Sequence, residues 1–64
     1  MTTHPDSQLI TRFVKRCARE RMTLEEMGRA VDRSKGWASE IINGKIAHLR
    51  FCTRNRILEY MGEL

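Results

Sequence analysis

The stretch from Met22 to Lys45 constrains the fold of this chain most, because it has the pattern of two short helices separated by a tight break. Thr23 and Glu26 have the T-x-x-E spacing of a capping box, in which a hydroxyl and a carboxylate each accept a hydrogen bond from a free backbone N–H at a helix start. Ser34 is a plausible N-cap for the second helix. The caps therefore predict two helix starts within this stretch.

The apolar residues of the stretch follow the helical repeat on both sides of the break. Before it, Leu24, Met27 and Val31 give the first helix one apolar face. After it, the apolar residues of a second helix are Trp37, Ala38, Ile41 and Ile42. Asn43-Gly44 ends that helix, because both residues tolerate left-handed backbone. A helix, a turn of about four residues and a second helix form a helix-turn-helix pattern.

The segment before this pattern predicts a tail and one more helix. We expect residues 1–7 to form a flexible tail, because Pro5 interrupts a helix there and Asp6 or Ser7 can cap the next helix. From position 7 or 8 to about 20, apolar side chains fall on one helical face and basic side chains on the other.

The segment after the pattern predicts a loop at 45–48, a possible helical turn at 49–51, and a last helix from about Thr53 to Met61. No stretch alternates as a strand does. We therefore predict a single all-α domain over residues 1–64, compact, with four or five helices. Its expected core is Phe13, Val14, Cys17, Met27, Val31, Ala38, Ile41, Phe51, Ile57, Leu58 and Met61.

Composition points to a nucleic-acid partner. Among 64 residues, twelve Lys and Arg against eight Asp and Glu give a net charge of +4 and a pI near 9.7, which meets the first criterion for such a protein. There is no apolar signal core and no apolar run near the roughly 20 residues of a membrane span, so we expect a soluble cytoplasmic protein. Cys17 and Cys52 are expected to be reduced, buried thiols.

The sequence lacks the patterns of catalytic and metal sites. Glu25 and Glu26 are adjacent and point to different sides of a helix, so they cannot act as a carboxylate pair. His48 and Cys52 have i,i+4 spacing, with Cys17 and His4 elsewhere, but no C-x-x-C or paired-His motif accompanies them. We expect no enzyme activity, no metal, no cofactor and no small-molecule ligand.

The Met22–Lys45 pattern resembles the Cro and phage-repressor (Xre-type) helix-turn-helix family. The matching residues are Thr23, Glu25, Glu26, Met27, Gly28, Val31, Ser34, Ser39, Ile41 and Asn43-Gly44-Lys45. Gly28 stands where the family has a small residue that lets the two helices cross closely. The resemblance covers roughly a third of the chain and implies a lambda-repressor-like fold.

Four residues depart from the family pattern. Asp32 occupies the turn where the family usually has Gly, and Asp adopts left-handed backbone at modest cost. Arg33 and Ala38 replace apolar residues, the second of them a larger one, and Ile42 stands where Glu is usual. These departures indicate a divergent member and affect local packing more than fold class.

The resemblance implies that a recognition helix, about Ser34–Ile42, enters the major groove of double-stranded DNA. The positions implied to face the bases are Lys35, Gly36, Ser39 and Glu40. Lys35 can donate to guanine and Glu40 can accept from cytosine N4. The residues expected to contact the DNA backbone are Thr23, Leu24, Arg33, Ser34, Trp37, Asn43 and Lys45.

Some of these residues have alternative interpretations. Trp37 either packs against the first helix of the pair or donates its indole N–H to a phosphate. Most of the basic stripe Arg12, Lys15, Arg16 and Arg19 is expected to be a solvated face, and Arg50, Arg54 and Arg56 form a possible second basic patch.

The family commonly binds two-fold operators as dimers. A homodimer of this chain would use its last helix and tail, with Leu49, Phe51, Tyr60 and Leu64 as candidates, although Tyr60 and Leu64 can instead close the monomer core. The leading hypothesis is a small Cro-like repressor of a phage or mobile element that acts by operator occupancy in a bacterial cell. The alternatives are a helical protein–protein adaptor that has lost DNA binding, and a regulator of the antitoxin or restriction-controller type.

Overall fold

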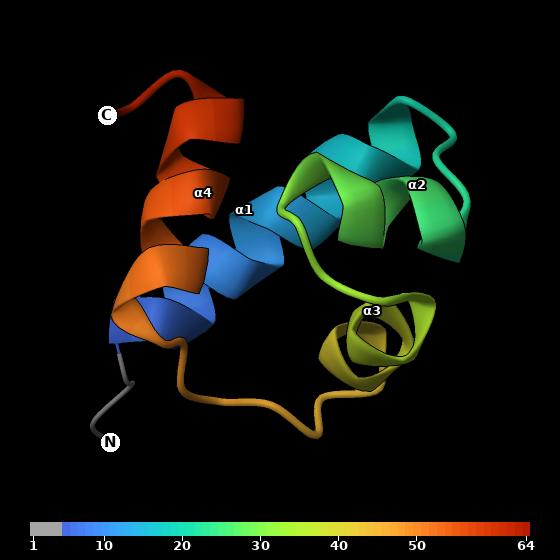
Figure 1. Ribbon diagram of the computed structural model, residues 1–64, viewed down its shortest axis with the longest axis horizontal. Helices are drawn as coiled ribbons and strands as arrows, with labels where there is room; N and C mark the ends of the chain where they lie inside the picture. Colours follow the sequence, from blue (N-terminus) through green and yellow to red (C-terminus); the bar gives the residue numbers. More distant parts are fainter. Residues whose placement is uncertain (1–4) are drawn as a thin grey trace.

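The computed structural model describes residues 5–64, which form four helices and no strand. They are α1 (Pro5–Arg19), α2 (Leu24–Ala30), α3 (Lys35–Ile42) and α4 (Phe51–Met61). In Figure 1, α1 runs through the middle of the molecule, with α4 at one end and α2 and α3 at the other. No helix in this described range is long and apolar enough to cross a membrane. The predicted all-α class is confirmed.

Helix α1 begins earlier than the sequence suggested. Pro5 is its first residue, a position that suits proline because the fixed φ is helical and the missing N–H would have no partner there. The prediction of a flexible tail is therefore wrong for residues 5–7, while residues 1–4 of that tail lie outside the described range. Asp6 is not an N-cap but sits inside the first turn of the helix.

Asp6 joins the start of α1 to the start of α4. Its side chain is only 3% exposed and accepts a 2.9 Å hydrogen bond from the backbone N–H of Leu49. Both carboxylate oxygens also accept from the Arg54 guanidinium at 2.9 Å. We call this group of three residues the clasp. It connects α1 to the loop 43–50 and to α4. The starts of α1 and α4 lie close together in Figure 1.

The helix-turn-helix forms as its caps predict. The Thr23 hydroxyl accepts from the Glu26 N–H at 3.1 Å, and the Glu26 carboxylate accepts from the Thr23 N–H at 2.8 Å. The bond from the Thr23 backbone holds the pKa of the Glu26 carboxyl below its usual value. The Ser34 hydroxyl caps α3 by accepting from the Trp37 N–H at 3.2 Å.

Helix α2 lies so close to the turn before α3 that only glycine fits at position 28. A Cβ on Gly28 would lie 2.6 Å from the backbone oxygens of both Arg33 and Ser34, which is well inside van der Waals contact. The close approach expected at Gly28 is present, but the backbone that it meets belongs to the turn and not to α3. This pair of helices has the most extensive contact of any in the described chain.

Each helix is followed by a residue with left-handed backbone. The φ angles are 54° at Arg21, 59° at Asp32, 74° at Gly44 and 76° at Gly62. After each of them, the next N–H reaches the carbonyl five residues earlier, as from Met22 to Cys17 at 3.0 Å, which completes a Schellman motif. Asp32 takes the turn conformation predicted for it, whereas no pattern in the sequence marks Arg21.

The buried core lies between α1, the helix pair and α4. Its residues are Leu9, Ile10, Phe13, Cys17, Met27, Val31, Trp37, Ala38, Ile41, Leu49 and Ile57. Val14, Leu58 and Met61, also expected in the core, are half-buried against it. Phe51 was expected there as well but is 72% exposed. Thr53 and Ile57 define the inward face of α4, and Phe51, two residues before Thr53, points about 200° away from it.

Candidate nucleic-acid interface

The four predicted base-facing residues lie on one outer face of α3. Lys35, Gly36 and Glu40 are exposed and Ser39 is half-buried. At about 100° per residue, these positions span an arc of about 140°. The opposite side of the helix carries the buried residues Trp37, Ala38 and Ile41. The structure thus gathers the predicted base-facing residues on a helix whose other face is fixed in the core.

Asn43 lies on the same face, just beyond the end of α3. Its side-chain nitrogen is 3.4 Å from the Ser39 hydroxyl, to which it donates. This bond holds Ser39, which was expected to face the bases, next to Asn43, which was expected to contact the DNA backbone. Lys45 follows in the loop and is exposed.

Gly36 differs from Gly28 in its surroundings. A Cβ there would meet only the Ser34 hydroxyl, at an ordinary contact distance of 3.7 Å. No part of the described chain therefore requires glycine at position 36, although glycine lowers helix stability by up to about 1 kcal/mol. A close approach of another molecule would provide a reason for this residue.

The start of α2 is a weaker phosphate site than expected. Thr23 is exposed, but its hydroxyl and its N–H are both engaged by Glu26. Glu25 and Glu26 also place two carboxylates in the first turn, where they oppose a phosphate. Half-buried Leu24 can offer only its backbone N–H.

Trp37 belongs to the core. It is 7% exposed, and its ring lies 6.3 Å from that of Phe13 on α1. The guanidinium of exposed Arg33 covers the ring at 6.0 Å. Trp37 is therefore packed, with Phe13 of α1 as its aromatic neighbour, and only a small part of its surface remains accessible.

Ion pairs separate the structural cations from the available ones. Four of the twelve Lys and Arg side chains pair with carboxylates of residues 5–64: Arg12 with Glu63, Arg16 with Glu20, Arg54 with Asp6, and Arg56 with Asp32 at 3.8 Å. In that same range the cations outside such pairs are Lys15, Arg19, Arg21, Arg29, Arg33, Lys35, Lys45 and Arg50. Two residues of the predicted α1 stripe, Arg12 and Arg16, are therefore engaged within the domain, as are Arg54 and Arg56 of the predicted second patch.

The predicted dimer residues fall into two groups. Leu49 is buried in the monomer core, so its assignment to an interface is wrong. Tyr60 is half-buried, packs edge-on against Phe13 at 5.7 Å, and donates its hydroxyl to the Glu20 carboxylate. Burial, followed by this hydrogen bond, raises the pKa of Tyr60 to about 12. Tyr60 thus closes the monomer core, in agreement with its alternative interpretation.

Phe51 and Leu64 are the dimer candidates that stay exposed, at 72% and 69%. They lie at the first residue of α4 and at the end of the chain, respectively. Leu49 was expected at the surface but lies in the core. Its backbone N–H donates to Asp6, and this bond holds the loop against α1.

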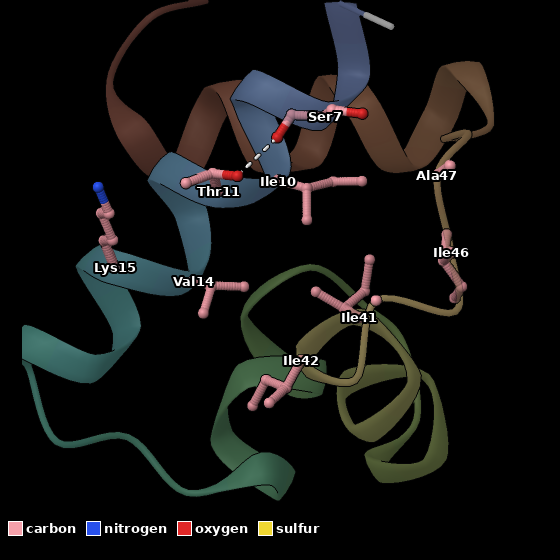
Figure 2. Close-up of a pocket in the computed structure, with 10 residues that line it drawn as sticks. Ser7, Ile10, Thr11, Val14, Lys15, Ile41, Ile42, Ile46 and Ala47 are labelled. Carbon is pink, nitrogen blue, oxygen red and sulfur yellow. Dashed lines mark hydrogen bonds between the residues drawn. The ribbon is translucent and has the colours of Figure 1, made fainter. Parts of the chain in front are cut away.

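A groove of about 440 Å³ separates α1 from α3 and the following loop. Figure 2 shows Ile10 and Val14 of α1 facing Ile41 and Ile42 of α3, with Ile46 and Ala47 on the loop side. Ile42 is 48% exposed. No carboxylate lines this groove, and its walls are mostly apolar, which suits a protein side chain better than a nucleic acid.

The two cysteines have different environments. Cys17 is buried, and burial raises the pKa of its thiol to about 11. Cys52 is exposed, so the expectation of two buried thiols is wrong for it. Within residues 5–64, no three His, Cys, Asp or Glu side chains gather as ligands for a metal ion, and His4 lies outside that range.

Comparison with protein-family models, with curated proteins and with solved structures gives no match for this chain.

Proposed function

We propose that this protein is a sequence-specific DNA-binding transcriptional regulator, a small Cro-like repressor that acts by occupying its operator. The observation that carries the proposal is the outer face of α3, where Lys35, Gly36, Ser39 and Glu40 lie together on a helix anchored in the core. The close backbone contact at Gly28 supports it, because a recognition helix must be held in a fixed orientation.

In the proposed complex, α3 lies in the major groove. Lys35 donates to guanine O6 or N7, and Glu40 accepts from cytosine N4. Arg33 and Lys45, at opposite ends of α3, are cations outside ion pairs and neutralise flanking phosphates. Each phosphate contact adds about 0.9 to the slope of log affinity against log salt concentration.

A two-fold operator requires two copies of α3, about 34 Å apart. Because Leu49 and Tyr60 belong to the monomer core, the proposed homodimer relies on Phe51 and Leu64. Analytical ultracentrifugation with and without DNA tests this part. Phe51→Glu is expected to weaken dimerisation and operator binding together while leaving the helical content unchanged.

A salt-dependent mobility shift on fragments from the region upstream of the gene tests DNA binding. We expect Lys35→Ala with Glu40→Ala to reduce specific binding by at least about tenfold, since a good base contact is worth about 1–3 kcal/mol. The matched control is Arg19→Ala with Glu59→Ala, which removes one cation and one carboxylate from exposed positions outside α3 and its groove. Absence of binding to every fragment at low salt by the folded protein would refute the proposal.

The second candidate function is a protein–protein adaptor, and the apolar groove between α1 and α3 favours it. Exposed Ile42 borders this groove where the resembling family usually has Glu. Two variants distinguish the DNA-binding function from the adaptor function. Ile42→Glu abolishes adaptor activity but leaves DNA binding nearly intact, whereas Lys35→Ala does the reverse.

A further inference from the structure

A second, smaller pocket lies between α3, the loop and the start of α4. Its volume is about 140 Å³. It is lined by Arg33, Trp37, Ile46, His48, Leu49, Arg50 and Thr53. Two guanidinium groups and an imidazole thus meet at one cavity, and no carboxylate lines it. The charge of its lining suits an anion.

Two nearly buried donors in this lining have no hydrogen-bond partner in residues 5–64. Trp37 is 7% and Thr53 is 6% exposed, and neither the indole N–H nor the hydroxyl bonds to another described residue. No fully buried polar side-chain atom of that range lacks a partner, so both groups keep a small contact with solvent. Since both residues line the pocket, we place that contact inside it.

The backbone adds a third source of donors. Helix α4 begins after Arg50 without a side-chain cap and with no acidic residue in its first turn. The N–H groups of residues 51–53 have no partner within the helix, and the positive end of the helix dipole favours an anion at this point. Thr53, which lines the pocket, belongs to that first turn.

We propose that this pocket binds a phosphate group through Arg33, Arg50, the Trp37 indole N–H and the Thr53 hydroxyl. At about 140 Å³ the pocket has room for a tetrahedral oxyanion. The phosphate-binding pocket is inferred from its lining and does not depend on DNA binding. Two ligands carry the phosphate group that would fit it: a phosphodiester of bound DNA, which rests on the proposed function, and a free phosphate monoester.

Trp37 is the only tryptophan and lines this pocket, so its indole N–H gives one signal that can be followed there. The test is a titration of the whole chain with inorganic phosphate at constant ionic strength, with chloride as the replaced anion. The NMR signals followed are the Trp37 indole N–H and the amides of residues 51–53. We expect saturable shifts at these groups, because the phosphate accepts hydrogen bonds from them.

Three variants sharpen the titration. Arg50→Gln is expected to weaken phosphate binding about tenfold, and Thr53→Val about threefold, in line with charged and neutral hydrogen bonds. Arg19→Gln removes an exposed cation that does not line the pocket and is expected to change nothing. Arg50 is exposed, so its variant stays informative even if Thr53→Val disturbs the core.

The proposal is overturned if phosphate leaves the Trp37 indole signal in place, or if Arg19→Gln weakens binding as much as Arg50→Gln does. A short DNA duplex then identifies the source of the phosphate. Movement of the same indole signal by the duplex, reduced in Arg50→Gln, assigns the pocket to the DNA backbone. A phosphate response with no duplex response assigns it to a free phosphate. Failure of DNA binding in the mobility shift leaves the phosphate titration interpretable.

Discussion

The helix pair α2–α3 and the junction of α1 with α4 are held together by different means. In the pair, backbone meets backbone at Gly28, and the caps at Thr23 and Ser34 bond to residues three positions away. At the junction, the clasp of Asp6, Leu49 and Arg54 joins residues 43 and 48 positions apart in the chain. The pair is thus specified locally, while the junction depends on the whole chain having folded.

This difference has a functional consequence. The pair offers the candidate recognition face and has almost no freedom to adjust, whereas the junction is a polar connection through side chains. We expect damage to the pair to unfold the domain and damage to the junction to loosen α4. Single substitutions in each region, together with a change of pH, test this contrast from the largest expected effect to the smallest.

The largest effect is expected for Gly28→Ala. Two backbone oxygens at 2.6 Å from the added Cβ force α2 and the turn apart, which we expect to lower the free energy of unfolding by about 3 kcal/mol. Gly36→Ala is the matched control, with a Cβ in ordinary contact only, and it should raise stability by up to about 1 kcal/mol. Urea denaturation measures both. Equal effects of the two substitutions would contradict the close approach at Gly28.

Asp6→Ala is expected to have the next largest effect. It removes a buried carboxylate that accepts from Leu49 and Arg54, at an expected loss of about 2–3 kcal/mol. The control Glu63→Ala removes the exposed pair with Arg12, which is worth less than about 1 kcal/mol. Hydrogen exchange should show faster exchange in α4 than in α3 for Asp6→Ala. Uniform loss of protection would argue against a separable junction.

High pH is expected to destabilise the protein through Cys17. Its thiol ionises near pH 9 in the unfolded chain but near 11 in the folded one, because burial disfavours the thiolate. Between these values the unfolded state binds fewer protons, so the free energy of unfolding falls as the pH rises. Tyr60, with its pKa raised to about 12, extends the fall above pH 10.

Denaturation at pH 8 and pH 10.5 measures this dependence. Cys17→Ala should flatten the decline between pH 9 and 11, whereas Cys52→Ala, at an exposed thiol, should leave it unchanged. An identical slope in both variants would show that Cys17 is not its source.

The smallest effects are expected at the left-handed residues that follow α1 and α2. Arg21→Gly and Asp32→Gly each relieve a positive φ, of 54° and 59°, and should stabilise the fold by up to about 1 kcal/mol. The gain in stability should be smaller for Asp32→Gly, because this substitution also removes the ion pair between Asp32 and Arg56, whose charged atoms are 3.8 Å apart. Thermal denaturation at moderate salt compares the two.

The features that could be predicted from the sequence follow the same division. The capping box, the close approach at Gly28 and the left-handed turn at Asp32 are predictable, because each depends on neighbours a few residues away. The start of α1 at Pro5 and the burial of Leu49 are not, because both depend on the clasp.

The same limit applies to the candidate sites. The outer face of α3 could be predicted from the sequence, since its residues belong to one short helix, whereas their assignment as base-facing positions came from the family resemblance. The pocket at the start of α4 could not, because it joins Trp37 to Thr53 across the loop between two helices. The sequence marks the exposed cation Arg50 only as part of a basic patch, and no local pattern links it to Arg33.

If the proposed dimer binds a two-fold operator, the clasp also bears on the spacing of the two half-sites. The loop 43–50 is held at one end by the capped terminus of α3 and at the other by the bond from Leu49 to Asp6. It therefore connects α3 to α4 with both of its ends held by hydrogen bonds. If two copies pair through residues of α4, the distance between their two α3 helices depends on this loop. A carboxylate that contacts no base would then help to determine how many base pairs separate the two half-sites that one dimer can read.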